Sequence, residues 1–216
     1  MKEVMVVPEY SQVQTYLKCD RENFTNIIKH FSKVLSDLNL PNDYFKSDFT
    51  WEVADDGFVY VGGGPEEHLL LVEDSLLHIR PYIMGWTPEV INDLDTSWIE
   101  LSILFWTEEI ELDIDTGLLR EKFKPYIWSV LNKFSNEFNQ TGTFFTNETT
   151  DGKPWEAIVE DDREWLLSFD AAIIPKELIN KFMDLNLDIF FAKQEINQLF
   201  ISRKRVWGEE PWEMTR

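Results

Sequence analysis

The chain has 216 residues, 40 of them acidic and 20 basic, which gives a formal net charge of −20 at pH 7. Apolar residues make up 44% and aromatic residues 14%, a composition too hydrophobic for an intrinsically disordered acidic protein. So negative a protein should repel nucleic acid phosphates and anionic lipids, and should attract basic partners.

The single cysteine, Cys19, cannot form a disulfide within the chain. This fits a reducing compartment, so the cytoplasm is the expected location. The apolar run at residues 4–7 is too short for a signal peptide or for a membrane span of about 20 residues. We therefore expect no membrane association.

Apolar residues recur at helical spacing after Asp20, which predicts an amphipathic helix over residues 21–38 with Pro41 just beyond its end. Strands and turns should follow. The expected elements are strands at 51–53 and 58–61 around a turn at 55–57, a hairpin of 68–72 and 76–82, a short helix at 88–94, and strands at 98–106 and 110–114.

In the last two of these strands the apolar residues alternate in opposite phase, at odd-numbered positions in the first and at even-numbered positions in the second. Apolar residues alternate along residues 99–105 and again along residues 110–114, but the phase changes between them. A turn or bulge at residues 107–109 is therefore expected, and Phe105 and Leu112 are both predicted to be core residues.

The second half of the chain is expected to repeat the order of elements in the first. The expected elements are a helix at 125–138, strands at 143–146, 154–160 and 164–169, a helix from 175 to about 185, and strands at 188–192 and 199–206. Residue matches that place Val72 on Val159 and Pro88 on Pro175 favour an internal duplication.

The predicted fold class is α+β, with two similar helix-strands-helix-hairpin units containing antiparallel sheets. The first unit would span residues 1–117 and the second residues 118–216, packed as one compact chain. This element order and the acidity resemble type III secretion chaperones and the related YbjN-like proteins. The resemblance implies tandem units of that fold and binding to other polypeptides, but it carries no functional residue.

Charge is concentrated in the first unit, where residues 1–117 hold 23 of the acidic and 7 of the basic residues. Between Asp48 and Gly117 the only basic residue is Arg80, against seventeen acids. This run ends in an alternation of acidic and aliphatic residues, whose acids would project from one side of a strand about 6.6 to 7 Å apart. The acids of this acidic ladder are Glu109, Glu111, Asp113 and Asp115.

Three interpretations of the acidic ladder remain open. It can be a solvated outer face, a docking ladder for the Lys or Arg side chains of a protein, or a metal site. A calcium loop of the EF-hand type is excluded, because Gly117, Leu118 and Lys124 stand where the pattern requires a ligand, a glycine and a glutamate.

Two tryptophans, Trp207 and Trp212, lie in a C-terminal tail among acidic residues. They are candidate anchors for a partner, or the tail folds back and closes one edge of the core. No catalytic residue is recognised, because no nucleophile has an activating neighbour at motif spacing. No cofactor is expected, since Gly62, Gly63 and Gly64 lack the lysine of a phosphate loop, and no residue is assigned as a metal ligand.

The sequence thus favours a non-enzymatic acidic binding protein that masks a basic protein partner, in the manner of a secretion chaperone or an immunity protein. The partner-binding residues would be the four acids of the acidic ladder together with Trp207 and Trp212. The alternatives are an enzyme with a carboxylate-lined pocket, which could depend on a metal, and an inhibitor that mimics DNA. The oligomeric state cannot be predicted.

Overall fold

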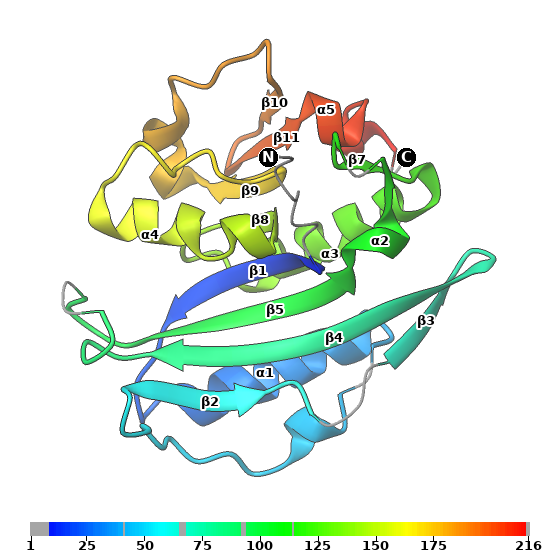
Figure 1. Cartoon of the computed structure of the whole chain (residues 1–216). Coiled ribbons are helices and arrows are strands. Elements are labelled where there is room, and N and C mark those ends of the chain that lie inside the picture. Colours follow the sequence, from blue (N-terminus) through cyan, green and yellow to red (C-terminus); the bar gives the residue numbers. More distant parts are fainter. Residues whose placement is uncertain (1–8, 41, 65–67, 92–93, 114, 215–216) are drawn as a thin grey trace, which may run out of the picture.

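The computed structural model describes residues 9–40, 42–64, 68–91, 94–113 and 115–214. Its frame is a nine-stranded antiparallel sheet (Figure 1). The strands of this sheet are β1 (Tyr10–Lys18), β2 (Phe58–Gly62), β3 (His68–Val72), β4 (Ser75–Trp86), β5 (Trp98–Trp106), β8 (Thr143–Asn147), β9 (Ala171–Pro175), β10 (Phe190–Gln194) and β11 (Gln198–Arg203).

The strand order is β10-β11-β9-β8-β1-β5-β4-β2, and β3 pairs with β4 off this path. A separate small sheet pairs β6 (Glu111–Asp113) with β7 (Leu118–Leu119). The helices are α1 (Phe24–Asp37), α2 (Thr107–Ile110), α3 (Lys124–Glu137), α4 (Lys153–Glu160) and α5 (Lys204–Trp207), and the 3₁₀ helices are η1 (Tyr44–Lys46), η2 (Glu121–Phe123), η3 (Glu148–Thr150), η4 (Lys176–Phe182) and η5 (Pro211–Glu213).

Two helices, α1 and α3, cover one face of the sheet and form the main core with it. Their apolar residues lie on one helical stripe, and Phe31 of α1 packs against Phe134 of α3 with ring centroids 6.0 Å apart. On the opposite face, α4 and η4 cover the part of the sheet near β8 and β9, and Figure 1 shows α4 on the side away from α1. We call the α1 side the covered face and the α4 side the open face.

β1 is the centre of the sheet, and the sequence analysis assigned no strand there. It pairs with β5 of the first half on one side and with β8 of the second half on the other, so that Val13 lies opposite both Ile103 and Phe145. Strands from both halves therefore form one sheet, through backbone hydrogen bonds that β1 makes in both directions.

Several predicted elements are confirmed. The first helix, the 68–82 hairpin, the 98–106 strand, the helix near 125–138 and the strand near 143 lie where they were expected. The predicted cap Asp20 closes the turn that leads into α1, because its Oδ1 accepts hydrogen bonds from the backbone N–H groups of Glu22 and Asn23.

Other predicted elements are wrong. Residues 51–53 and 164–169 form no strand, and residues 154–160 belong to α4 instead of a strand. Of the predicted helix at 88–94, residues 88–90 form a turn and residues 92 and 93 lie outside the described residues. In α4, Pro154 occupies the first turn, where proline is well tolerated, while Trp155, Ile158 and Val159 recur at helical spacing and pack on the sheet.

The fold is α+β, but two similar tandem units are not confirmed. Val72 ends strand β3 whereas its proposed counterpart Val159 lies in helix α4, so that pairing of positions is wrong. Pro88 follows β4 in a turn, while Pro175 is the last residue of β9. The shared pattern of aliphatic residues, Pro and Asn thus does not mark equivalent elements here.

The parity change after β5 is resolved by the helical turn α2, which redirects the chain. Phe105 is fully buried, as predicted, and so is Ile110. Leu112 was predicted to be core, but it is 61% exposed because β6 is only three residues long and pairs with β7 away from the large sheet. Residue 114 lies outside the described residues.

Within the described residues, no helix combines the length and the apolar character that crossing a bilayer requires.

The different burial of Phe105 and Leu112 can be tested directly. Phe105→Ala should lower the free energy of unfolding by about 3 to 5 kcal/mol, because it leaves a cavity under the sheet. Leu112→Ala should change it by within about 0.5 kcal/mol, as expected for a surface position. Urea denaturation of both variants measures this, and equal losses would contradict the position of β6.

Candidate protein-interaction surface

The β3–β4 hairpin exposes a row of leucines on its open face. Leu69, Leu71 and Leu76 are 56%, 66% and 59% exposed. The register pairs Leu71 with Leu76 and Leu69 with His78, so these four side chains share one face. On the other face of the hairpin Leu77 is fully buried and its cross-strand partner Leu70 is partly buried, so most of the exposed apolar surface lies on the open face.

The hairpin projects because β4 changes its partner along one edge. β3 pairs with residues 75–79 of β4, and β2 pairs with residues 83–86. Pro81 lies between these stretches, where it has no N–H group to offer a neighbouring strand. Gly63 passes close to this point, since a Cβ there would lie 2.5 Å from the carbonyl oxygen of Pro81.

His78 and Glu109 anchor the base of the leucine row. The His78 ring stacks on Trp106 with centroids 4.1 Å apart. Glu109, in α2, accepts a hydrogen bond from the His78 backbone N–H at 2.8 Å and pairs with His78 Nδ1 through its other oxygen. The contacts fix the root of the hairpin against β5 and α2.

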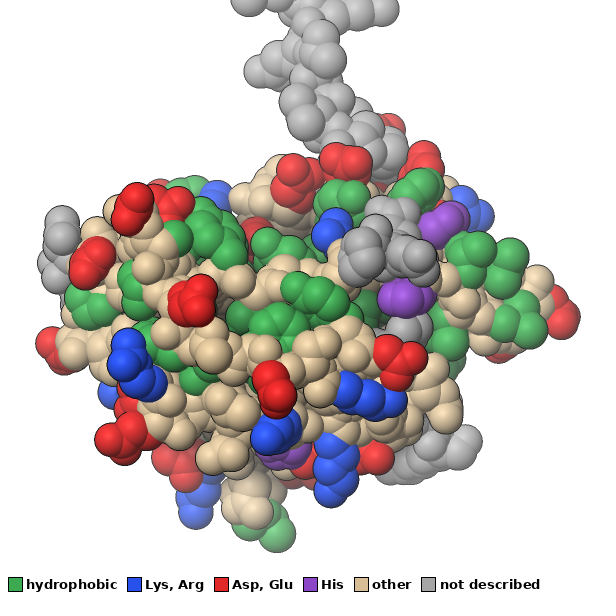
Figure 2. Space-filling model, turned by 90° about the horizontal axis from the view of Figure 1, so that it is seen from below, with side chains coloured by type: hydrophobic (Ala, Val, Ile, Leu, Met, Phe, Trp, Pro, Cys, Tyr) green, Lys and Arg blue, Asp and Glu red, His purple; other side chains and the backbone are tan. Residues whose placement is uncertain are grey.

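Acidic residues flank the leucines. Glu73 and Asp74 form the exposed turn at the tip of the hairpin, and Glu108 is exposed at its base in α2. In Figure 2 the hairpin is the projection at the right, with apolar side chains along it and acidic side chains at its end. We call Leu69, Leu71 and Leu76, together with Glu73 and Asp74, the hairpin patch.

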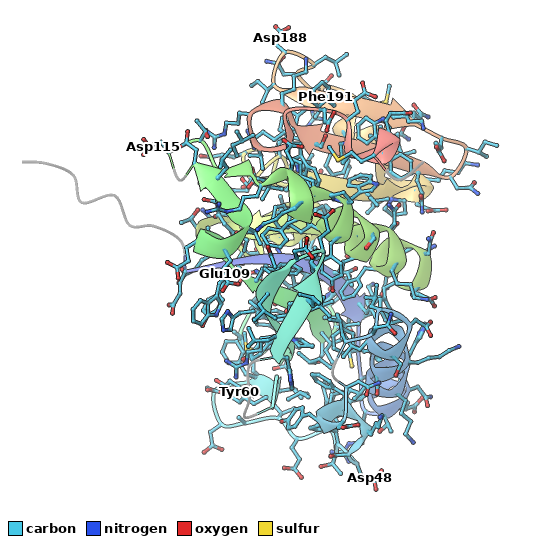
Figure 3. All side chains as sticks on the ribbon, turned by 90° about the vertical axis from the view of Figure 1, so that its right-hand side faces the viewer. Asp48, Tyr60, Glu109, Asp115, Asp188 and Phe191 are labelled. Carbon is cyan, nitrogen blue, oxygen red and sulfur yellow. The ribbon has the colours of Figure 1, made fainter. Side chains whose placement is uncertain are left out.

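The acidic ladder is not a row on one strand. Glu109 belongs to α2, Glu111 and Asp113 begin and end β6, and Asp115 lies in the following turn. Figure 3 shows Glu109 and Asp115 at different heights on one side of the molecule, and Asp48 far away at its lower end. Acids of residues 48–117 thus lie in distant parts of the molecule. On the side seen in Figure 2, acidic and basic side chains are interspersed.

Glu111 differs from its neighbours because it is half-buried. Burial, together with the nearby carboxylates of Asp170 and Asp113, raises the pKa of Glu111 to about 7. A group in this position is poorly suited to meet a partner, whereas Asp113 and Asp115 are exposed.

The two predicted tryptophan anchors are buried in the core. Trp207 and Trp212 both pack on Trp128 of α3, each with ring centroids 5.8 Å apart, and Trp207 Nε1 donates to the carbonyl oxygen of Asp170 at 3.0 Å. The tail therefore closes the edge of the core, which was the alternative interpretation. These side chains cannot contact a partner unless the tail opens.

Beneath the other end of the open face lies a buried polar cluster. Glu100 of β5 is only 4% exposed and lies opposite Tyr16 of β1 in the register. Both polar atoms of the Gln14 side-chain amide have partners in one orientation. In it the oxygen accepts a hydrogen bond from Thr146 Oγ1 at 2.8 Å, and the nitrogen faces the carboxylates of Glu100 and Asp151. That nitrogen then lies 2.8 Å from Asp151 Oδ1 and 3.3 Å from Glu100 Oε1.

Burial is the main influence on the two acids of this cluster. It raises the pKa of Glu100 well above its usual range, and the neighbouring Asp151 raises it further. Desolvation of the carboxyl group also raises the pKa of Asp151 to about 6, although part of that residue remains exposed to solvent. No basic side chain contributes to either shift among the described residues.

Neither of two open cavities offers an evident catalytic arrangement. One, of about 370 Å³, lies between Lys18, Trp98 and the C-terminal end of α4, and the other, of about 570 Å³, lies around residues 195–198. Neither Glu100 nor Asp151 lines either cavity. Within the described part of the chain, no group of three His, Cys, Asp or Glu side chains is placed to hold a metal ion.

Comparisons of the chain with protein-family models, with curated proteins and with solved structures found no match.

The sequence analysis located the hairpin but not its exposed face. After His68 the strand is an uninterrupted apolar run, residues 69–72. Such a run usually indicates a strand that is buried on both faces. One available signal was the acidic turn Glu73 and Asp74 directly after the run, because charged tips are typical of strands that project into solvent.

The role of Glu109 separates it from the rest of the acidic ladder. Glu109→Ala should lower the free energy of unfolding by about 1 to 3 kcal/mol, because it leaves the partly buried backbone N–H of His78 without its acceptor. Asp115→Ala, at an exposed site in the same acidic run, should change it by within about 0.5 kcal/mol. Guanidinium denaturation of the two variants checks this, and a neutral Glu109→Ala would show that the His78 contacts do not hold the hairpin.

Proposed function

We propose that the protein is a non-enzymatic binding protein, and that the hairpin patch docks on a basic protein partner. The observation that carries this proposal is the row of three more than half-exposed leucines on one face of a projecting hairpin. Contiguous apolar surface that is rimmed by charge is typical of protein interaction sites.

The leucines and the acids of the patch have different roles. Leu69, Leu71 and Leu76 would be buried in the complex and would keep the partner bound, since buried apolar contacts at the centre of an interface determine its lifetime. Glu73 and Asp74 lie at the rim, where charge mainly affects the rate of encounter. The net charge of −20 acts in the same direction at longer range.

The complementary partner is a protein with an apolar strip flanked by Lys or Arg side chains. Acidic proteins that mask such surfaces include secretion chaperones and immunity proteins, and we propose a role of that class. An inhibitor that mimics DNA is less well supported, because the acids of the acidic ladder lie on different elements and do not form the regular rows that such mimicry would need.

The cytoplasm is the proposed place of this encounter. Cys19 is buried, and burial together with Asp20 raises the pKa of its thiol to about 12. The thiol therefore stays protonated and unreactive at neutral pH, as suits a structural cysteine in a reducing compartment.

The proposal is tested by retention of native partners on the tagged protein at low salt. The altered variant carries Leu69→Ser, Leu71→Ser and Leu76→Ser. A matched control carries Met183→Ser, Leu187→Ser and Ile196→Ser, which are also more than half exposed but lie elsewhere. A basic protein should be retained by the wild type and the control, should elute as salt rises, and should bind the hairpin variant at least about tenfold more weakly.

Capture of proteins by the wild type alone does not support the proposal. Retention of the same proteins by the hairpin variant would overturn it, and so would loss from both triple variants. Partners that elute independently of salt would contradict the electrostatic part and leave only the apolar contact.

A further inference from the structure

The buried acid Glu100 lies directly under the segment that contains η3 and α4. Its cross-strand neighbour Tyr16 is covered by Trp155 of α4, whose ring stacks on it with centroids 4.8 Å apart and an interplanar angle of 13°. Trp155 also stacks on Trp86 of β4 at 5.5 Å. These aromatic contacts hold α4 on the open face of the sheet.

The same segment brings a second acid to Glu100. Asp151 lies between η3 and α4, and its Oδ1 and Glu100 Oε1 can share the Gln14 side-chain nitrogen. If both acids ionise, two negative charges lie close together, and the neutral amide cannot compensate for them. Asp151 is partly exposed to solvent, whereas Glu100 is buried and bears most of the cost.

We propose that Glu100 is a pH-sensitive latch: protonated Glu100 allows the segment of residues 147–160 to pack on the sheet, and its ionisation loosens that segment. The proposal does not depend on the proposed function. It depends on the position of Glu100 beneath the Tyr16–Trp155 stack and on the absence of a compensating cation among the described neighbours.

The neighbouring groups that titrate or carry charge come from every element around Glu100. Tyr16 of β1 and Tyr82 of β4 are neutral at physiological pH, because burial raises the pKa of both phenols. The Ser102 hydroxyl of β5, which donates to the Tyr82 carbonyl oxygen at 3.3 Å, also lies near Glu100 and lowers its pKa, which partly offsets the effect of burial. The charged groups around this shell are Arg80 on β4, and Glu148, Asp151, Lys153 and Glu156 on the segment that contains η3 and α4.

The expected direction follows from the raised pKa of Glu100 in the folded state. An unfolded glutamate has a pKa of about 4.3. The contribution of Glu100 to stability is therefore fully present below that pH, and it is lost as pH rises toward the higher pKa of the folded state. Each unit of difference between the two pKa values allows up to about a tenfold change in the opening equilibrium.

The first experiment compares hydrogen exchange of α4 amides in the wild type and in Glu100→Gln between about pH 5 and pH 8, with α1 amides as the internal control. The isosteric amide removes the titration, so the ratio of α4 exchange rates, wild type to variant, should rise with pH. The α1 ratio should stay constant. A constant α4 ratio would overturn the proposal.

Asp151→Asn provides a second comparison, because it removes the acid that raises the pKa of Glu100. The pH-dependent change in α4 exchange should become smaller in this variant, whereas Asp115→Asn, at an exposed site far from the latch, should behave as the wild type does. An Asp151→Asn profile equal to that of the wild type would contradict the coupling between the two acids.

A third measurement needs no variant at this site. Carbon-13 NMR of the Glu111→Gln variant, with glutamate side chains labelled, should still show a carboxyl group that stays protonated well above the ordinary pKa of about 4.3. This variant is used because Glu111 in the wild type also has a strongly raised pKa. Titration of every glutamate near that ordinary value would overturn the proposal even if Glu100→Gln does not fold.

Discussion

The pairing of β1 with both β5 and β8 is the constraint on which the rest of the structure depends. β1 is the first element of the described chain, yet it lies in the middle of the sheet, with strands of the first half on one side and of the second half on the other. Its side chains are buried on both faces from Ser11 to Tyr16. The two halves therefore share one sheet and one core, and β1 is the strand that joins them.

Both candidate functional regions are positioned through this strand. The side chains that β1 directs to the open face include Gln14 and Tyr16, which meet Glu100 and support Trp155. β1 also fixes β5, whose last residue Trp106 stacks on His78 at the root of the hairpin. The interaction surface and the buried acid Glu100 thus lie on the same face of one sheet but at different ends, so each can be altered without the other.

The sequence predicted elements well where apolar periodicity was strong. α1, α3 and β5 were found because apolar residues recur along each at a regular spacing, as in Phe24, Ile28 and Phe31. β1 was missed because the side that it turns to the open face carries Gln12, Gln14 and Tyr16. Gln14 accepts from Thr146 Oγ1 and donates to Tyr16 Oη and Asp151 Oδ1, and Gln12 also hydrogen-bonds to Asp151. Such compensation is visible only when the partner strands are known.

The candidate site was less predictable for a related reason. Alternation of acids from Glu109 to Asp115 suggested a strand, but the helical turn α2 and the short strand β6 separate these residues. Trp207 and Trp212 lie in a polar tail, yet Trp128 of α3 provides an aromatic surface that buries both. In each case a contact from a distant part of the chain decided the exposure.

Hydrogen exchange of the β1 amides tests the central role of this strand most directly. Amides of residues 13–17 that bond to β5 and β8 should be among the slowest in the protein and should exchange only through global unfolding. Their exchange should then show the same dependence on denaturant as the overall unfolding transition. Exchange of these amides at the rates of exposed loops would contradict the position of β1 and, with it, the single sheet that joins the two halves.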